Sequence, residues 1–262
     1  GRSLKAIRKY ENWTGSGIPT ETDTADEVIE YRYNSDGIRI GKTVDGIVHE
    51  YLLDGIKVQQ EKIGNSILYY TYGSDGQLVS VSYGGEEYYY TYNAQGDVVG
   101  LLDSEANVAA RYYYDAWGNH IAIEDGEGNT ITDLTHIAHI NPYRYRGYRY
   151  DSETNLYYLQ SRYYNPGWGR FINEDDTTLL LSSPGKAHWD KNVFAYCDNN
   201  PLNRVDEDGE CWDIIIGGIV GGIVSGASSV VNDAIMGRET TVGSVLESVI
   251  VGVIAGGVSA SI

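Results

Sequence analysis

The sequence predicts a mainly β protein, an antiparallel ribbon of strands followed by a Gly-rich apolar segment. Tyr contributes 24 of the 262 residues, Gly 32 and Pro only 5, a composition typical of extended strands joined by turns. A motif built on Tyr and Gly recurs at short intervals, and the composition changes abruptly between residues 209 and 212. These three observations carry the prediction of the fold.

The repeated motif is Tyr-x-Tyr followed by a turn that ends in Gly and then by an apolar strand. Its copies are Tyr31–Gly37, Tyr70–Gly76, Tyr90–Gly96 and Tyr112–Gly118, with a weaker one at Tyr51–Gly55. Their glycines follow one another at intervals of 18 to 22 residues, a period typical of repeat architectures. Alternating Tyr gives a strand one aromatic face, and Asn, Asp and Gly provide turns. Hairpins of this kind must pair edge to edge, so residues 1–135 are expected to form a long antiparallel sheet that curls around an interior.

The charge balance argues against a nucleic-acid-binding surface. Asp and Glu number 37 against 19 Lys and Arg, a formal net charge of −18, whereas nucleic acids need a basic face. Arginines interleaved with tyrosines could stack on bases in another context, but we expect packing against internal carboxylates and tyrosines. The tyrosine stripes fit either a carbohydrate-binding surface or cross-strand packing, and their regular period favours packing. The interleaved arginines are Arg144, Arg146, Arg149, Arg162 and Arg170.

The sequence predicts no cofactor and no metal site. His136 and His139 lie three residues apart without an obvious third ligand. Cys197 and Cys211 are either a pair in an oxidising compartment or two unrelated thiols, and the second alternative is favoured. The chain starts at Gly1 with no visible signal peptide, so we expect a fragment of a longer protein.

The stretch from 141 to 176 is the most specific in the chain. It reads Asn-Pro-Tyr-Arg-Tyr-Arg-Gly-Tyr-Arg-Tyr-Asp (141–151), continues through Leu-Tyr-Tyr-Leu-Gln-Ser-Arg-Tyr-Tyr (156–164) and ends in Gly-Arg-Phe-Ile-Asn-Glu-Asp-Asp (169–176). This stretch resembles the core that closes Rhs/YD-repeat proteins, which include bacterial polymorphic toxins and wall-associated proteins, and the upstream units resemble YD repeats. The core motif comprises Arg146, Gly147, Tyr150, Asp151, Leu156, Tyr157, Tyr158, Arg162, Tyr163, Tyr164, Gly169, Arg170 and Phe171.

The resemblance implies a hollow architecture. In this family the strand ribbon spirals into a shell, the core plugs one end, and a C-terminal toxin is held inside or released there. Residues 136–210 would therefore form the plug of a shell built by the preceding repeats. With about five repeat units in this sequence, we expect an incomplete shell that further repeats would close.

The resemblance also implies chemistry, because many members carry an intramolecular aspartyl protease. Its two aspartates map to Asp175 and Asp206, with the cut between Glu210 and Cys211. Two close carboxylates can share one proton, so that one activates water while the other protonates the carbonyl or the leaving amine.

This sequence departs from the family pattern around the predicted dyad. Asp176 and Glu207 stand where the family has Pro, and Glu210 replaces an apolar residue. The neighbouring Asp208 could be mistaken for Asp206, whose choice rests on alignment alone. Active cleavage and a purely structural role of both aspartates stay open.

Residues 211–262 form a segment of different composition, rich in Gly, Val, Ile, Ser and Ala. Two apolar stretches, 214–231 and 242–262, predict a helical hairpin, and glycines at four-residue spacing suit close packing of helices in lipid. This hairpin would be the start of a truncated toxin or translocation region. It would contact a membrane or stay stored inside the shell, and a third alternative makes it a pore-forming effector.

The predicted function is that of a shell and core plug that encapsulates, and by self-cleavage releases, the effector of a secreted or surface-located bacterial toxin. Its partners would be its own C-terminal toxin domain beyond this sequence, an immunity protein and a secretion-system component, and not nucleic acid. The alternative is a cell-surface structural or adhesion module that binds glycan or wall polymer without protease activity.

Overall fold

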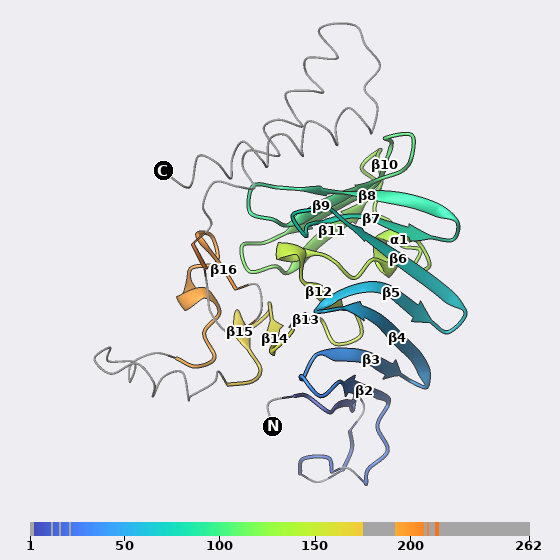
Figure 1. Cartoon of the computed structure of the whole chain (residues 1–262). Helices are drawn as coiled ribbons and strands as arrows, with labels where there is room; N and C mark the ends of the chain where they lie inside the picture. Colours follow the sequence, from blue (N-terminus) through green and yellow to red (C-terminus); the bar gives the residue numbers. More distant parts are fainter. Residues whose placement is uncertain are drawn as a thin grey trace, which may run out of the picture.

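The computed structural model describes residues 3–11, 13–15, 17–20, 22–174, 192–206 and 209, and the backbone of 213–214. Two antiparallel sheets make up most of it, and the smaller sheet packs on one face of the larger (Figure 1). The prediction of a mainly β, antiparallel protein is confirmed.

The larger sheet contains eleven strands that follow one another in chain order, each hydrogen-bonded to the next. Its strands are β1 (Ala6–Lys9), β2 (Glu27–Tyr33), β3 (Arg39–Val44), β4 (Ile47–Asp54), β5 (Lys57–Ile63), β6 (Ser66–Tyr72), β7 (Leu78–Tyr83), β8 (Glu86–Tyr92), β9 (Val98–Leu102), β10 (Val108–Tyr114) and β11 (His120–Glu124).

Five turns in and after this sheet share one hydrogen-bond pattern. In the turn that begins at Asn93, the side-chain Oδ1 accepts from the backbone N–H groups of Gln95 and Asp97. The N–H of Gly96 donates to the Asn93 carbonyl, and Gly96 adopts a φ of +83°, which Gly accepts without a steric penalty. The other four turns begin at Asn34, Asp103, Asp115 and Asp125.

A register shift accompanies each Tyr-x-Tyr motif and bends the sheet. In the four full copies the shift falls directly before the second tyrosine, as between Thr71 and Tyr72. A bulge of this kind bends its strand and increases the local twist. Because the bulges recur at the same place in each unit, the sheet curls, as Figure 1 shows for β2 to β11.

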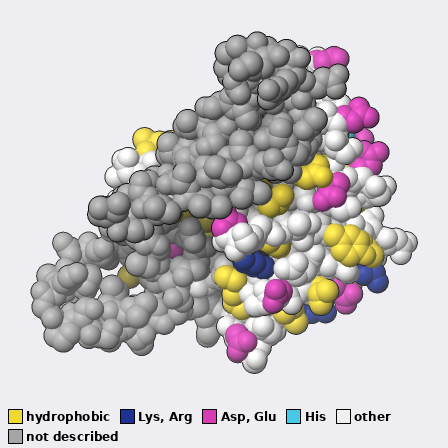
Figure 2. All heavy atoms as spheres, turned by 45° about the horizontal axis from the view of Figure 1, so that its top comes forward, with side chains coloured by type: hydrophobic (Ala, Val, Ile, Leu, Met, Phe, Trp, Pro, Cys, Tyr) yellow, Lys and Arg dark blue, Asp and Glu magenta, His cyan; other side chains and the backbone are white. Residues whose placement is uncertain are grey.

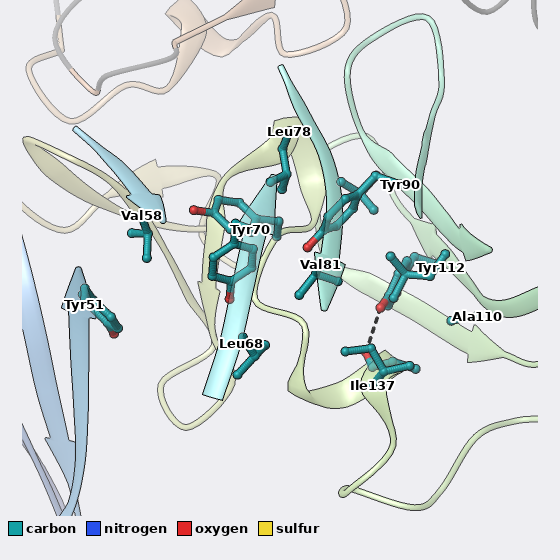
Figure 3. Close-up of a cluster of buried hydrophobic side chains, with 14 residues drawn as sticks. Tyr51, Val58, Leu68, Tyr70, Leu78, Val81, Tyr90, Ala110, Tyr112 and Ile137 are labelled. Carbon is teal, nitrogen blue, oxygen red and sulfur yellow. Dashed lines mark hydrogen bonds between the residues drawn. The ribbon is translucent and has the colours of Figure 1, made fainter. Parts of the chain in front are cut away.

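The tyrosines of the repeats face the inside of this curve. Tyr70, Tyr90 and Tyr112 are buried in one cluster with aliphatic side chains of the strands that follow each turn (Figure 3). In the three later full copies the second tyrosine donates its hydroxyl proton to a carbonyl of the preceding strand, as from Tyr92 to Leu78 at 2.6 Å and from Tyr114 to Val98 at 2.8 Å. The interpretation of the tyrosine stripes as cross-strand packing is confirmed.

The core region supplies the second sheet and three short helical turns. The sheet consists of β12 (Arg149–Asp151), β13 (Leu156–Leu159), β14 (Arg162–Asn165) and β15 (Arg170–Phe171). Helix α1 (Ile137–Ile140) packs against β10, and η1 (Tyr145–Gly147) lies beside β9. The turn η2 (Cys197–Asn199) leads to β16 (Arg204–Val205), which pairs with β17 (Asp213–Ile214).

Two parts of the predicted architecture require correction. The described residues do not form a closed shell, because β1 and β11 each pair with a single neighbour at opposite edges of the sheet. Asp213 and Ile214 form a strand with β16, although a helical segment was expected from residue 211. The two apolar stretches of the expected hairpin otherwise lie outside the described residues. Where the chain is described, no helix is both long and apolar enough to span a membrane.

The exposed surface of the sheet is chemically mixed. On the described part of the face in Figure 2, hydrophobic, acidic and basic side chains are interspersed. The exposed large apolar residues of the sheet and its turns include Ile47, Val48, Leu52, Ile56 and Tyr69. Single exposed apolar side chains are ordinary on protein surfaces, and we assign them no function.

Replacement of Ala106 by Gly is expected to stabilise the fold. It adopts a φ of +65° in the position that Gly holds in the other four turns. We expect Ala106→Gly to raise the free energy of unfolding by about 0.5 kcal/mol, because relief of a left-handed penalty of about 1 kcal/mol exceeds the entropic cost of the added Gly. Urea unfolding measures it. The matched control Ala94→Gly, at an exposed turn position that does not have a positive φ, should destabilise; equal losses in both variants would contradict the explanation.

Candidate functional site

The core motif predicted from sequence is assembled into one structural unit. Most of its side chains are buried, and Arg170 is exposed. Arg146 and Gly147 lie in η1, Tyr150 and Asp151 in β12, Leu156, Tyr157 and Tyr158 in β13, Arg162, Tyr163 and Tyr164 in β14, Gly169 in the turn before β15, and Arg170 and Phe171 in β15.

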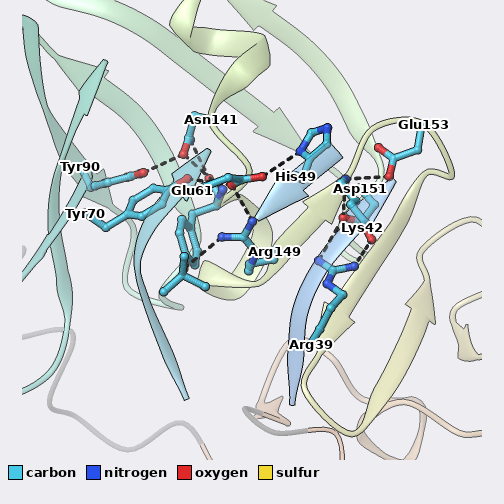
Figure 4. A network of polar contacts seen from close by, with 12 residues as sticks. Arg39, Lys42, His49, Glu61, Tyr70, Tyr90, Asn141, Arg149, Asp151 and Glu153 are labelled. Carbon is cyan, nitrogen blue, oxygen red and sulfur yellow. Dashed lines mark hydrogen bonds and ion pairs between the residues drawn. The ribbon is translucent and has the colours of Figure 1, made fainter. Parts of the chain in front are cut away.

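Asp151 joins the core to the first described repeat through a buried charge cluster (Figure 4). Its carboxylate accepts from both Nη atoms of Arg39, at 2.5 and 3.1 Å, and from Nζ of Lys42 at 2.9 Å. Lys42 also donates to Glu153 at 2.6 Å. Burial by itself would raise the pKa of Asp151, but the charges of Arg39 and Lys42 outweigh it and lower that pKa to about 2.

Glu61 lies in a second buried charge cluster, in which the charges of repeat and core are reversed. Its carboxylate accepts from Nη2 of Arg149 at 2.7 Å, from Nδ1 of His49 at 3.0 Å and from the Tyr70 hydroxyl at 3.2 Å (Figure 4). Burial would raise the pKa of Glu61, yet the Arg149 charge and the hydrogen bond from His49 hold it below its ordinary value. In this cluster the repeat supplies the anion and the core supplies the cation.

Four of the five interleaved arginines are buried, as predicted for internal packing. The guanidinium groups of Arg144 and Arg149 lie 4.6 Å from the ring centroids of Tyr112 and Tyr51, respectively. Arg144 donates to the carbonyls of Asn141 at 2.9 Å and Ala138 at 2.8 Å. These contacts assign Arg144 and Arg149 to the junction between core and repeats.

Arg146 links a repeat turn to the chain segment that leads out of the core. Its Nη1 donates to the Gln95 carbonyl at 2.6 Å, and its Nη2 donates to the Pro201 carbonyl. The Gln95 side chain in turn donates to the Leu202 carbonyl at 2.9 Å. The backbone N–H of Arg146, at a φ of +55°, donates to Asp97 at 3.0 Å. We call residues 201–206 and 209 the exit strap; Arg146 fixes its beginning.

Arg162 fixes the end of the exit strap. Its Nε donates to the Gly209 carbonyl, and its Nη2 lies 3.3 Å from Oδ2 of Asp206. The other carboxylate oxygen of Asp206 accepts from the Gly209 N–H at 2.8 Å. The Asp206 N–H donates to the Tyr148 hydroxyl at 3.2 Å. Asp206 is therefore buried and held from several sides, at 2% exposure.

Gly209 could not be another residue without rearrangement. It adopts a φ of +78°, and a Cβ built on it would lie 2.7 Å from both the Leu159 carbonyl oxygen and Oγ of Ser161. Only Gly adopts this conformation and this close approach at low cost. The strap thus ends in direct contact with the β13–β14 hairpin, one residue before the predicted cut.

The predicted catalytic pair is described only in part. Asp206 lies in the exit strap, whereas Asp175, Glu210 and Cys211 lie outside the described residues. The dyad and the site of the cut therefore stay predictions.

The histidines and the cysteine singled out in the sequence have structural contacts. Nδ1 of His136 accepts from the Ala138 N–H at 3.2 Å and caps α1, while His139 donates to the Ile131 carbonyl at 2.8 Å. Cys197 is buried, which raises the pKa of its thiol to about 12; Cys211 lies outside the described residues. Within the described part of the chain, no three His, Cys, Asp or Glu residues are grouped as metal ligands.

The sequence analysis did not predict the charged repeat residues that pair with the core, although the repeat pattern contains a signal for them. In each unit one residue of the strand after the turn pairs with a Tyr or Leu of the strand before it. This residue is Arg39 in the first unit, and in the others it is Val58, Leu78, Val98 and His120. Lys42 and Glu61 likewise replace the inward Val81, Leu101 and Ile123. Charges at apolar repeat positions predict buried partners of opposite charge.

Known toxin-related proteins are similar to this chain in sequence. The chain is 40% identical over 196 residues to the tRNA3(Ser)-specific nuclease WapA of Bacillus spizizenii and 40% identical over 193 residues to the tRNA nuclease WapA of Bacillus subtilis. Each match covers 72% of this chain but 8% of the relative. The double-stranded DNA deaminase toxin A of Burkholderia cenocepacia is 35% identical over 106 residues, 40% of this chain and 6% of that protein.

Solved structures agree on the fold. The crystal structure of TcdB2-TccC3-TEV aligns over 79% of this chain and 10% of its own, with a TM-score of 0.54 and 19% identity. A Tc holotoxin pore of Photorhabdus luminescens aligns over 79% of this chain and 9% of its own, with a TM-score of 0.51 and 18% identity. No protein-family model matches the chain. The chain is thus related to a segment of Rhs and toxin-like proteins; the identity of the units as YD repeats stays a prediction.

The lowered pKa of Asp151 predicts an acid-dependent loss of stability. A carboxyl group whose pKa is about 2 when folded and about 3.9 when unfolded stabilises the fold fully above about pH 5 and loses this contribution as the pH falls through about 2. Asp151→Asn should therefore cost about 3–5 kcal/mol at pH 7 by leaving buried cations unpaired.

Guanidinium unfolding at pH 7, 4 and 3 measures this difference. The gap between parent and Asp151→Asn should narrow toward pH 3. Asp103→Asn, at a carboxyl group on an exposed turn, provides a control with a much smaller effect at pH 7. A gap for Asp151→Asn that stays constant with pH would contradict the role of the ionised carboxylate.

Proposed function

We propose that the chain is the repeat sheet and core plug of a bacterial Rhs toxin, which encloses a C-terminal effector and releases it by autoproteolysis. The observation that supports this best is the exit strap, in which buried Arg162 holds the carboxylate of Asp206 and the carbonyl of Gly209. The strap leads from the plug to the predicted cut between Glu210 and Cys211. The relatives among large toxin-related proteins agree with a role in delivery.

The proposed cut is a hydrolysis carried out by two aspartates. The ionised member of the Asp175–Asp206 pair takes a proton from water, whose oxygen adds to the carbonyl carbon of Glu210. The protonated member gives its proton to the carbonyl oxygen, which forms a tetrahedral diol. As the C–N bond breaks, the member that took the proton from water passes it to the nitrogen of Cys211, and the other member takes a proton back from the diol. The products are a carboxyl terminus at Glu210 and an amino terminus at Cys211.

The remaining parts of the proposal concern the whole protein. The matched segment is 8% of the WapA relatives, and in a protein of that length further repeats would extend the curled sheet into a closed shell. An immunity protein and a secretion-system component would be its partners, and the protein would act outside the producing cell or at its surface. Membrane contact through 214–231 and 242–262 belongs to the same proposal, with the toxin domain following.

The burial of the repeat tyrosines speaks against the adhesion alternative. The first tyrosine of each unit packs inside the curve of the sheet, where it cannot present its ring to a glycan. Tyr69 and Tyr113 are partly exposed, at 51% and 42%, but they lie on strands far apart in the sheet order and do not form an aromatic stripe.

The proposed cleavage is tested by the intact mass of the full chain over time near neutral and mildly acidic pH. We expect a cut between Glu210 and Cys211 in the parent. Asp175→Asn and Asp206→Asn should each slow it by at least about 100-fold, the lower range for a general acid or base.

Asp208→Asn is the matched control and should cleave at the parental rate, because Asp208 is the neighbouring acid that the proposal leaves out of the pair. A parent chain that stays whole for days would refute autoproteolysis and leave both aspartates structural. Equal loss in Asp208→Asn would overturn the assignment of Asp206.

A further inference from the structure

We propose that Arg162 is the positioning residue of the cut, holding Asp206 and the carbonyl of Gly209 in a fixed mutual geometry. This inference rests on the proposed autoproteolysis and adds a residue to it. Arg162 acts on the cut through these two groups, which it binds directly. Its side chain is 2% exposed on β14, so water does not compete for these contacts.

The guanidinium group of Arg162 uses donors along three directions. Nε donates to the Gly209 carbonyl, Nη1 donates to the Val193 carbonyl at 3.2 Å, and Nη2 donates to Asp206 at 3.3 Å. Its central carbon lies 3.6 Å from the centroid of the Phe171 ring. A planar cation held on an aromatic face with its edge donors engaged has little freedom to rotate.

A hydrogen bond within the exit strap adds to the contacts of Arg162. Gly209 donates its N–H to Oδ1 of Asp206 at 2.8 Å, so Arg162, Asp206 and Gly209 form a closed ring of hydrogen bonds. Movement of the Gly209 carbonyl would therefore also displace the carboxylate. Since the predicted scissile carbonyl follows Gly209 by one residue, this ring couples the position of the acid to the position of its substrate.

The rate of a cut within one chain depends on how the reacting groups are placed relative to one another. A displacement of about 1 Å between reacting groups can cost about 100-fold in rate. Lys cannot replace Arg here, because an ammonium group is a point charge without a planar set of donors. The side chain should therefore be required as a guanidinium and not simply as a positive charge.

The test compares Arg162→Lys with the parent in the full chain, by intact mass over time. We expect cleavage at the same bond to slow by about 10- to 100-fold. Arg144→Lys is the matched control: Arg144 is equally buried and binds backbone carbonyls of the core, but it does not contact the exit strap. This control should keep the parental rate.

Chemical rescue separates positioning from general structural support. Arg162→Ala should regain at least 10-fold of its lost rate when methylguanidinium is added at millimolar concentration, because the small cation can occupy the vacated space over Phe171. Methylammonium should not restore it, and neither ion should change the parental rate. Thermal unfolding run alongside reports whether the variants fold.

Gly209→Ala provides a second test of the positioning role if the Arg162 variants do not fold. Its Cβ would push the strap away from Leu159 and Ser161, and it should slow the cut by about 10-fold or more with the core intact. Cleavage at the parental rate in Arg162→Lys and Gly209→Ala would overturn the positioning role and leave the proposed autoproteolysis standing. An uncut parent chain would overturn both.

Discussion

The position of the core region on the repeat sheet depends on ion pairs buried between them. Asp151 of the core lies between Arg39 and Lys42 of the sheet, and Arg149 of the core pairs with Glu61. A buried charge without its partner costs about 3–5 kcal/mol. A core shifted by one repeat would place Asp151 near Glu61 and leave Arg39 unpaired, so the charges select one register among similar repeats.

The repeats build the surface that makes this selection possible. Each full unit has a bulge before its second tyrosine, and three of the four close their turn with an Asn or Asp side chain. The bulges bend the sheet. Hydroxyl groups such as those of Tyr92 and Tyr114 tie neighbouring strands together on the inner side. The resulting curved, aromatic face can bury a second sheet, while its edges at β1 and β11 stay open among the described residues.

The same use of buried arginines extends from the core to the exit strap. Arg146 binds a turn of the repeat sheet and the Pro201 carbonyl, and Arg162 binds Asp206 and Gly209. Contacts with both the repeats and the core therefore hold the strap in this conformation. Under the proposed function, a cleavage that needed this conformation would be tied to completion of the fold.

The sequence by itself determined the repeat unit with its strands and turns, because hydrophobic alternation and turn residues act over a few neighbouring positions. It also predicted that the repeat tyrosines pack against one another across strands. Only the tertiary structure decided that Arg39 meets Asp151, more than a hundred residues away, and that Arg162 holds Gly209. Such contacts depend on the curvature and register of the whole sheet, which no local pattern specifies.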